Sequence, residues 1–362
     1  MPRPVRAAVV GGHRGRGYRR AFTALPQQVT LSAICDRDEA VLATWRQEFP
    51  DLPLFARLED LLEADVCDAV FLATPIQAHL PQTLAALAAG KHVLVEVVAA
   101  TTIDECWALI EAVERAGTTY MMAENYCYTR ANMMVRHMVQ QGVFGDRTYA
   151  EGAYLHDTRP LLFTAQGELT WRGELAKELN GNTYPTHSLG PVAQWLGTSG
   201  PRPDDRFVEL VCYVTPETGR WRYAAERFGS DHPAAQRGFF KMGDSASVLL
   251  RTERGAVAYI RRDAASARPH NMTHYTLQGT QGAYLAPRHG AEDPLVWIAG
   301  RSPGERYGQE RWQPLWDYAG EYEHPRWQER GAVAREAGHG GGDYFIVEDF
   351  LRAVHTGGAP AI

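Results

Sequence analysis

The sequence predicts an α/β protein in which a doubly wound parallel sheet is followed by an α+β domain with an open antiparallel sheet. Three observations lead to this prediction. In the first third of the chain, short and almost continuously apolar segments alternate with helix-like segments, as in a parallel sheet covered on both faces. A glycine-rich turn directly follows the first apolar segment. Beyond about residue 126, longer segments alternate apolar and polar residues, which is typical of half-buried antiparallel strands.

Strands and helices alternate regularly over the first part of the chain. Strands are predicted over residues 5–10, 29–35, 69–73, 92–95 and 119–123. Helices are predicted through residues 22–25 and over residues 38–48, 81–89 and 104–116. Asp38 is expected to cap the second helix, Gly90 to end the third, and Thr101 or Thr102 to cap the fourth.

The rest of the chain has a different pattern of apolar and polar residues. It is predicted to contain a helix over residues 130–141, strands over 207–214, 247–251, 256–261 and 273–278, and an amphipathic helix over 343–354. Residues 231–238 and 290–330 are rich in Gly, Pro, Trp and charge, so they are predicted to be loops. We therefore expect domains at residues 1–125 and 126–362, with the last helix able to pack back on the first domain.

Composition narrows the class of protein and its partners. The chain has 362 residues, of which 43 are acidic and 37 basic, so its formal net charge is −6. This balance gives no electrostatic reason to expect nucleic acid or a membrane as a partner, although a local pocket can oppose the global sign. The five cysteines are scattered without a CxxC pair, which argues against a disulfide framework and against a metal site. No leader-like segment and no apolar run of ~18 residues occurs, so a cytoplasmic protein is expected.

The glycine-rich turn, Gly-Gly-His-Arg-Gly-Arg-Gly over residues 11–17, is a candidate dinucleotide site. Such a turn brings backbone N–H groups close to a pyrophosphate at a helix N-terminus. The GxGxxG pattern counted from Gly12 fails only at Arg14, whereas counted from Gly11 it fails at two positions. Asp36 ends the second strand, where a carboxylate can hold the adenosine ribose, and this favours NAD over NADP. Two arginines nearby, Arg14 and Arg37, keep NADP open, and a glycine turn without a ligand is the alternative.

Two motifs place the first domain in a known superfamily. Ala73-Thr74-Pro75 followed by His79, and then Ala-Ala-Gly-Lys-His-Val-Leu-Val-Glu over residues 88–96, resemble the glucose–fructose oxidoreductase/inositol dehydrogenase (Gfo/Idh/MocA) superfamily. The resemblance implies a Rossmann domain, an open-sheet domain, and a homo-oligomer, a dimer or tetramer, formed through that sheet. Together with the turn, it implies cofactor contacts from Gly11, Gly12, His13, Arg14, Gly15, Arg16, Asp36, Arg37, Thr74, Pro75, His79, Glu96, Val97 and Asn125.

A departure from the superfamily pattern changes the expected chemistry. Where the dehydrogenases have Lys-Pro after the glutamate, this chain has Val97-Val98. In the common members that lysine hydrogen-bonds the reacting sugar oxygen, and loss of such a donor typically costs ~10²–10³ in rate. Either activity is lost or other groups handle the proton.

One branch of the superfamily has such a replacement, namely the NAD-dependent glycosidases typified by α-N-acetylgalactosaminidase. The segments that resemble this branch lie at residues 96–107, 121–128, 150–159, 181–194, 278–282 and 338–341. The segment Gly-Asn-Thr-Tyr-Pro-Thr-His-Ser-Leu-Gly-Pro-Val-Ala-Gln over residues 181–194 matches almost without change. The departures are Val98, where the branch has proline, and the glycine turn.

The resemblance implies a mechanism without net redox change. The sugar C3 hydroxyl is oxidised, the C2 proton becomes acidic, the C1 leaving group is eliminated, water adds, and the hydride returns to C3. Such chemistry needs several acid/base groups around one ring and a hydride acceptor. We expect Tyr184, His187 and Tyr154 to transfer protons, because histidine titrates near neutrality and a tyrosine beside positive charge becomes more acidic. Candidate substrate-binding residues are Glu124, Arg172, His156, Asn182 and His339.

Alternatives remain at this point. The chain could be an NAD(P)-dependent sugar or polyol dehydrogenase that uses Tyr184 or His187 in place of the lysine, or a non-catalytic sugar or dinucleotide sensor. Tyr154 and Glu124 could also be packed structural residues. The identity of the sugar, its anomer and its leaving group are left open, and a sugar with an anionic group is compatible with the arginines. Relatives of this type extend past a turn like that at residues 357–360, so we expect the natural chain to continue beyond Ile362.

Overall fold

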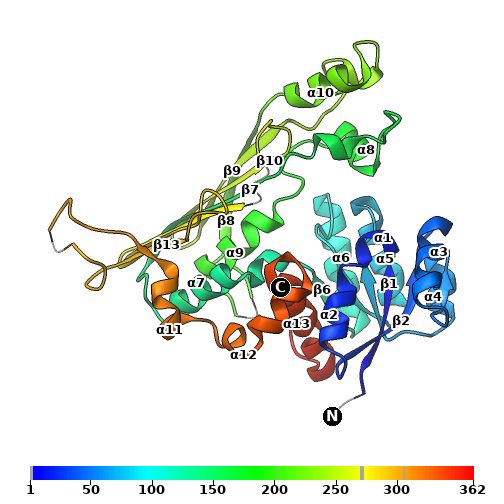
Figure 1. Cartoon of the computed structure of the whole chain (residues 1–362), viewed down its shortest axis with the longest axis horizontal. Coiled ribbons are helices and arrows are strands. Elements are labelled where there is room, and N and C mark those ends of the chain that lie inside the picture. Colours follow the sequence, from blue (N-terminus) through cyan, green and yellow to red (C-terminus); the bar gives the residue numbers. More distant parts are fainter. Residues whose placement is uncertain (1–2, 201, 270–272, 305) are drawn as a thin grey trace. The chain divides into compact units, whose positions relative to one another are not determined.

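The computed structural model describes residues 3–200, 202–269, 273–304 and 306–362. The first two residues of the N-terminal segment, Met1 and Pro2, lie outside the described residues. The chain forms two compact units (Figure 1). Unit 1 comprises Met1–Arg130 together with Arg326–Ile362, and unit 2 comprises Ala131–Pro325. No helix of the described segments is both long and apolar enough to cross a bilayer.

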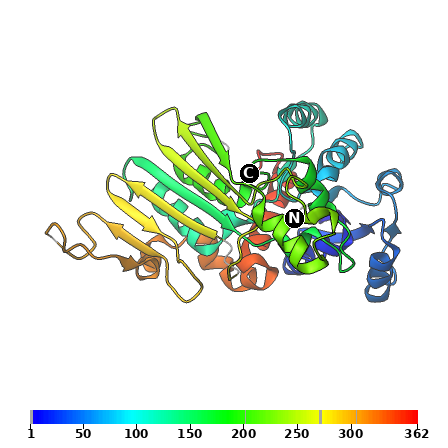
Figure 2. The same ribbon diagram turned by 90° about the horizontal axis from the view of Figure 1, so that it is seen from above.

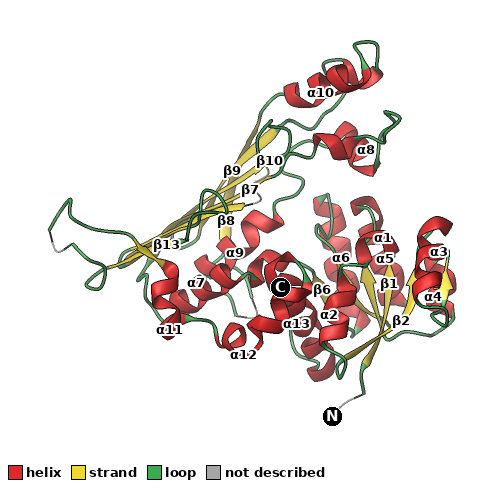
Figure 3. Ribbon diagram, viewed as in Figure 1, coloured by secondary structure: helices red, strands yellow, loops and turns green. Residues whose placement is uncertain are grey.

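Unit 1 is built on a parallel sheet with helices packed around it (Figure 3). Its described strands are β1 (Val5–Val10), β2 (Val29–Cys35), β3 (Leu54–Phe55), β4 (Ala69–Leu72), β5 (His92–Val95) and β6 (Tyr120–Met122). They lie in the order β3-β2-β1-β4-β5-β6, and the described neighbours pair in parallel. This order is that of the doubly wound dinucleotide-binding sheet. The predicted Rossmann fold is confirmed.

The helices of unit 1 come from both ends of the chain. They are α1 (Gly12–Gly15), α2 (Tyr18–Ala24), α3 (Glu39–Glu48), α4 (Leu58–Glu63), α5 (Ile76–Ala88), α6 (Ile103–Ala116), α12 (Pro325–Ala334) and α13 (Gly342–Thr356), with 3-10 turns η1 (Asn125–Tyr128), η5 (Arg335–Ala337) and η6 (His339–Gly341). The predicted caps form, since Asp38 accepts from the N–H of Ala40 and Thr102 makes a capping box with Glu105. Thus the local signals in this half of the sequence match the structure well.

The predicted start of the third helix is wrong. The helix α5 begins at Ile76 rather than at Pro81, which lies inside it. A proline within a helix removes one backbone hydrogen bond. Here the first turn is held by burial, because Ile76 is 5% and His79 1% exposed. Packing therefore outweighs the local effect of the proline.

The helix α13 is tied to the rest of unit 1 by a buried carboxylate. Asp349, only 3% exposed, accepts a hydrogen bond of 2.7 Å from the Tyr128 hydroxyl. It also pairs with Arg326 at 3.0 Å and with Arg352 at 2.9 Å. Burial alone would raise the pKa of Asp349, but Arg326, Tyr128 and Arg352 together hold it below its usual value. Phe350 adds an edge contact with Phe71, with ring centroids 5.3 Å apart.

We expect Asp349→Ala to destabilise the protein by about 2–3 kcal/mol, because it leaves the buried Tyr128 hydroxyl without its acceptor and leaves Arg326 with Glu348 as its carboxylate partner. The measurement is urea unfolding followed by tryptophan fluorescence. Since the pKa of Asp349 is lowered on folding, its contribution is present above about pH 4 and is lost as the pH falls below that value. Arg352→Ala is the matched control: it removes a mostly exposed partner and should cost about 1 kcal/mol or less. Equal losses in the two variants would contradict this account.

Unit 2 is built on a second, larger sheet. Its described strands are β7 (Arg147–Leu155), β8 (Phe207–Val214), β9 (Ser245–Thr252), β10 (Val257–Asp263), β11 (Thr273–Gly279), β12 (Gly282–Leu285), β13 (Leu295–Ile298) and β14 (Gln313–Pro314). They lie in the order β14-β13-β12-β11-β7-β10-β9-β8. The predicted antiparallel sheet is confirmed apart from one strand pair, because β10 and β7 pair in parallel, with Arg262 opposite Tyr154. The sheet is therefore mixed and mostly antiparallel.

Helices cover one face of this sheet and leave the other open, and Figure 2 looks onto the open face. The helices of unit 2 are α7 (Arg130–Gln140), α8 (Trp171–Glu178), α9 (Thr186–Leu196), α10 (Thr218–Phe228) and α11 (Ala319–Tyr322), with 3-10 turns η2 (Arg159–Leu162), η3 (Pro233–Ala235) and η4 (Leu315–Tyr318). Side chains of α7 and α9, such as Met134 and Trp195, form a core with Ile260 and Leu277 of the strands. On the open face, β8 exposes Val211 by 44% and Tyr213 by 75%, and the neighbouring β9 exposes Leu249 by 48%.

Several elements of the second half were not predicted. Helix α9 contains Pro191, and α8 contains Gly173, residues that lower helix propensity. Burial compensates, because Val192 and Trp195 of α9 are fully buried. The prediction of loops over residues 290–330 is wrong for β13, β14, α11 and α12. The short strand β13 forms by pairing with β12, a tertiary contact that leaves little periodic signal in the sequence.

Candidate active site

The glycine turn needs glycine at three positions, one of which is Gly12, where a Cβ would lie 2.8 Å from Nε1 of the buried Trp45. Gly11 has φ +90°, and a Cβ there would lie 2.5 Å from the carbonyl oxygen of Ala73. A Cβ at Gly15 would overlap Cγ1 of Val9, so this glycine lets α1 approach β1 closely. At Gly17 the obstacle is only the mobile end of Arg14. The required glycines are therefore Gly11, Gly12 and Gly15, a spacing that GxGxxG fits in neither register.

Asp36 follows β2 at the carboxyl edge of the parallel sheet. Its carboxylate accepts hydrogen bonds from the backbone N–H of Gly12, at 2.8 Å, and of Asp38, at 2.9 Å. The carboxylate is thus held against the glycine turn, where an acidic side chain can receive ribose hydroxyls. The residues present fit an NAD molecule at this edge.

The charged residues around the turn fall into two groups. Arg14 forms an ion pair of 2.7 Å with Glu96, and that carboxylate also accepts a hydrogen bond from the Tyr18 hydroxyl at 3.0 Å. Arg16 lies over the Trp45 ring and pairs with Glu48 at 3.5 Å. His13 and Arg37 are exposed. The predicted cofactor contacts of His13, Arg14, Arg16, Arg37 and Glu96 stay predictions.

Hydrogen bonds through His79 connect the Thr74-Pro75 motif to the segment after β5. The Thr74 hydroxyl donates to Gln82 at 2.6 Å. The ring nitrogens of His79 lie 2.7 Å from the carbonyl oxygen of Val98 and 2.8 Å from that of Thr74. Val97 and Val98, joined by a cis peptide bond, are buried, at 3% and 6% exposed. The position of the superfamily lysine is thus occupied by an apolar side chain without a proton to exchange.

A carboxylate that was not predicted connects two predicted residues in unit 1. Asp343, 3% exposed, accepts from the Asn125 amide at 2.8 Å and lies 2.8 Å from Nδ1 of His339. Among the described residues, the Oδ1 atom of Asn125 is buried without a hydrogen-bond partner, so it can accept a bond from a ligand. Glu124 is fully buried and accepts from the N–H of Tyr126 at 3.0 Å. The spacing of four residues between His339 and Asp343 was the signal available in the sequence.

The pKa of His339 is raised, chiefly by its hydrogen bond to Asp343. We expect a histidine titration by NMR to place it above the ordinary value of about 6.5, and Asp343→Asn to lower it. Because the pKa is raised on folding, the stability this pair contributes is complete at low pH, below that ordinary value, and is lost as the pH rises through the folded value. An unchanged His339 titration in Asp343→Asn would contradict the assignment.

The predicted proton-transfer residues of unit 2 form one cluster. Tyr154, at the end of β7, stacks on Tyr184 with ring centroids 5.8 Å apart. His187, in the first turn of α9, lies edge-on to both rings, at 5.0 Å from Tyr154 and 5.2 Å from Tyr184. The Tyr154 hydroxyl lies 2.6 Å from Nδ1 of His156. The structure thus brings together two phenols and two imidazoles from β7 and the segment that enters α9.

Polar groups surround this cluster. In the described part of the chain, both amide atoms of Asn182 are buried without a hydrogen-bond partner. Arg172 lies over the neighbouring Trp171 ring, at 4.2 Å from its centroid. Arg262, which was not predicted, lies 5.9 Å from the centroid of Tyr184. No motif marks Arg262 in the sequence, because only the parallel pairing of β10 with β7 places it beside Tyr154.

The comparisons with known proteins agree on one family. Residues 128–362 match the model described as "Glycosyl hydrolase 109, C-terminal domain", and residues 5–124 match "Oxidoreductase family, NAD-binding Rossmann fold". A glycosyl hydrolase family 109 protein of Shewanella woodyi is 33% identical over 95% of this chain and 75% of its own length. A second, from Shewanella amazonensis, is 32% identical over 98% of this chain and 77% of its own length. The chain belongs to glycosyl hydrolase family 109.

Solved structures share the fold of this family 109 protein at lower identity. Levoglucosan dehydrogenase in complex with NADH superposes with a TM-score of 0.76 at 18% identity, over 98% of this chain and 91% of that one. An oxidoreductase domain protein from Kribbella flavida gives a TM-score of 0.75 at 21% identity, over 99% and 92% of the two chains. These structures show a shared fold, whereas the match of residues 5–124 to the NAD-binding oxidoreductase model confirms the predicted Gfo/Idh/MocA superfamily and the NAD cofactor.

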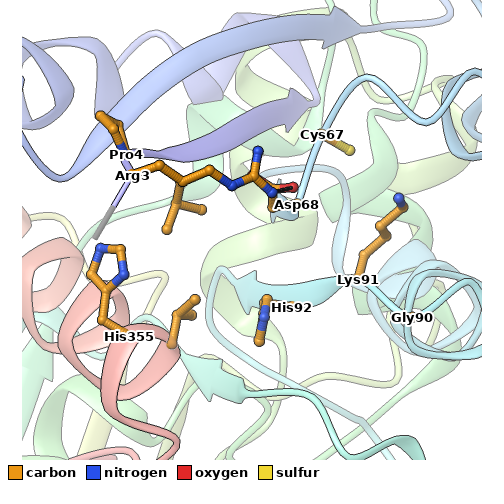
Figure 4. A pocket seen from close by; sticks show the side chains of 10 residues that line it. Arg3, Pro4, Cys67, Asp68, Gly90, Lys91, His92 and His355 are labelled. Atoms are coloured by element: carbon orange, nitrogen blue, oxygen red, sulfur yellow. Dashed lines mark hydrogen bonds and ion pairs between the residues drawn. The ribbon is translucent and has the colours of Figure 1, made fainter. Parts of the chain in front are cut away.

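A hollow in unit 1 of the family 109 protein lies away from this cofactor edge (Figure 4). It measures about 310 Å³ and is lined by residues at the amino ends of β1 and β5, such as Pro4 and His92. NAD is bound at the carboxyl ends of parallel strands. The cations here are neutralised, Arg3 by Asp68 at 3.0 Å and Lys91 by Asp65 at 2.5 Å. We therefore assign no ligand to this hollow.

Proposed function

We propose that this protein is an NAD-dependent glycosidase that cleaves its substrate through transient oxidation of the sugar at C3, elimination across C1 and C2, addition of water and re-reduction. The observation that carries the proposal is the cluster of Tyr154, Tyr184, His156 and His187 in a family 109 chain whose superfamily lysine is replaced by the buried Val97. The cluster offers several groups that can exchange protons, whereas the valine offers none.

When bound, NAD supplies a hydride acceptor for the C3 hydrogen and later returns the hydride. The protein's own residues handle the protons. The short contact between the Tyr154 hydroxyl and His156 lets the imidazole accept the phenolic proton, which makes the tyrosine oxygen a base. Tyr184 and His187 are the further acid/base pair, for the C2 proton and the leaving group. Removal of the C2 proton requires such a base within hydrogen-bond reach.

A sugar dehydrogenase is the second candidate, because levoglucosan dehydrogenase has the same fold. The two activities differ in their products. We expect the purified protein, incubated with NAD and a panel of aryl glycosides in deuterated water, to release the aglycone, incorporate deuterium at C2 and accumulate no NADH. Stoichiometric NADH from a free sugar, without bond cleavage, would establish the dehydrogenase instead. Binding of sugar and NAD with neither outcome would indicate a sensor.

We further propose that the enzyme is a cytoplasmic homo-oligomer that associates through the open face of the sheet in unit 2. The free cysteines support a reducing compartment, and the exposed Val211 and Tyr213 on the open face of β8 support association. Light scattering after size-exclusion chromatography tests the assembly. Tyr213→Lys should yield a smaller species than the parent protein, and an unchanged mass would locate the contact elsewhere.

A further inference from the structure

Two arginines beside the aromatic–histidine cluster, Arg262 and Arg172, have no acidic partner within the described residues. Arg262 of β10 donates from Nη1 to the Thr183 hydroxyl at 2.5 Å, and the same nitrogen lies 3.5 Å from the sulfur of Met242. Both partners are neutral. Arg172 of α8 rests over the Trp171 ring. After burial, the largest influences on the pKa of these two guanidiniums come from Tyr154, Tyr184 and neighbouring arginines, and no carboxylate is among them. The remaining N–H donors of Arg262 have no protein acceptor among the described residues.

The other arginines nearby are neutralised. Arg159 forms a bidentate ion pair with Asp157, in which Nε and Nη2 each donate to a carboxylate oxygen at 2.9 Å. Arg220 pairs with Asp244 at 3.3 Å, and Arg261 pairs with Asp263 at 2.9 Å. Arg262 and Arg172 therefore add positive charge to the cluster, in a chain whose overall charge is −6.

The strand register fixes where Arg262 points. Arg262 lies opposite Tyr154 in the parallel pairing of β10 and β7, so the two side chains share a face of the sheet. The neighbouring Arg261 lies on the opposite face. Thr183, which accepts from Arg262, directly precedes Tyr184. The guanidinium is therefore held beside both tyrosines of the proposed proton-transfer cluster.

Keeping this charge enclosed has a cost. Arg262 is half-buried, and the removal of water from its guanidinium lowers its pKa to about 10, with Arg220 and Arg172 adding repulsion. An enclosed cation without a counter-charge is destabilising. The first turn of α9 has no side-chain cap, so its backbone N–H groups add to the positive potential. An anionic group at this position would neutralise the Arg262 guanidinium and would be attracted by the N-terminus of α9.

We propose that the sugar bound by this cluster carries an anionic substituent, a carboxylate or a sulfate group, which Arg262 holds together with Arg172. The inference rests on the proposed function, in that the cluster is the sugar site. Arginine binds such planar or three-oxygen anions through paired, charge-assisted hydrogen bonds. Arg262 is thus a specificity-determining residue that selects acidic over neutral sugars.

The test is calorimetric binding to the NAD-loaded protein. The probes are galacturonate and glucuronate as carboxylates, galactose 6-sulfate and glucose 6-sulfate as sulfates, and galactose and glucose as their neutral parents. We expect at least one acidic sugar to bind about 10- to 100-fold more tightly than its parent, the range given by charge-assisted hydrogen bonds. Comparing the carboxylate and sulfate arms identifies the anion. Neutral parents that bind as tightly as every acid would overturn the proposal.

Variants assign the preference to the arginines. Arg262→Gln should bring the affinity for the acidic sugar down to that for its neutral parent, whereas Arg262→Lys should retain part of the preference. Arg261→Gln is the matched control on the same strand and should keep the full preference. If Arg262→Gln does not fold, Arg172→Gln serves instead and should reduce the preference at least threefold. A preference that survives in the Gln variants overturns the proposal.

The experiments distinguish failure of this inference from failure of the proposed glycosidase activity. Cleavage of neutral aryl glycosides, with deuterium at C2 but no preference for acidic sugars, overturns this inference alone. An Arg262-dependent preference for acidic sugars without cleavage of any glycoside supports this inference and overturns the glycosidase activity alone. A third outcome, in which Arg262→Gln shifts the pH profile of cleavage but not the sugar preference, would make Arg262 a positioning residue for Tyr184 and would also overturn the proposal.

Discussion

Tyr184→Phe will lower kcat by about 10²–10⁴-fold, the range that a positioned acid or base contributes, while NAD affinity stays within about twofold. The change removes one hydroxyl and keeps the ring that stacks on Tyr154, so packing in the cluster is preserved. His187→Ala should have an effect of similar size. The measurements are initial rates on the best aryl glycoside and fluorescence titration with NADH.

Tyr259→Phe is the matched control for this prediction. Its hydroxyl bonds to Ser247 rather than to the cluster, at 3.0 Å, so its removal should change kcat less than about twofold. Near-normal turnover in both Tyr184→Phe and His187→Ala would refute the assignment of the cluster to catalysis. Loss of NAD binding in these variants would indicate a structural role instead.

Gly11→Ala will weaken NAD binding by about 30- to 150-fold, because backbone strain and overlap cost on the order of 2–3 kcal/mol at a site whose backbone must approach the pyrophosphate. The left-handed φ of +90° strains any side chain, and the added Cβ meets the rigid backbone of Ala73. The measurement is calorimetric titration with NAD.

Gly17→Ala provides the control within the same turn. Its Cβ would meet only the end of the Arg14 side chain, which can move, and its φ of −58° suits alanine. We expect NAD affinity in Gly17→Ala to stay within about threefold of the parent protein. If the two variants weakened binding equally, the turn would be intolerant of any Cβ and the distinction drawn from the backbone would be wrong.

Local sequence signals predicted most of unit 1. Buried parallel strands are apolar on both faces, so Ala69–Leu72 and His92–Val95 stand out as short apolar runs. Caps such as Asp38 and Thr102 act within one turn and can be read directly. The start of α5 could not be predicted, because burial of Ile76 and His79 outweighs Pro81 only once the sheet is formed.

The candidate site was predicted in part. The segment containing Tyr184 and His187 stands out by its resemblance to the NAD-dependent glycosidases, and the structure brings both residues to Tyr154. Asp343 and Arg262 were missed. Each becomes informative only through a partner distant in the chain, Asn125 for Asp343 and Tyr154 for Arg262.

The sequence by itself determined the fold class, the family and the cofactor, because these depend on periodicity, glycine turns and motifs that are local along the chain. Only the tertiary structure decided that β7 pairs with β10 in parallel, which glycines of the turn are required, and which charges lack partners. Pairing between strands more than a hundred residues apart depends on how whole faces pack, and a charge is neutralised or left free by its neighbours in space. For that reason Arg262 is one arginine among many in the sequence, and a determinant of specificity in the fold.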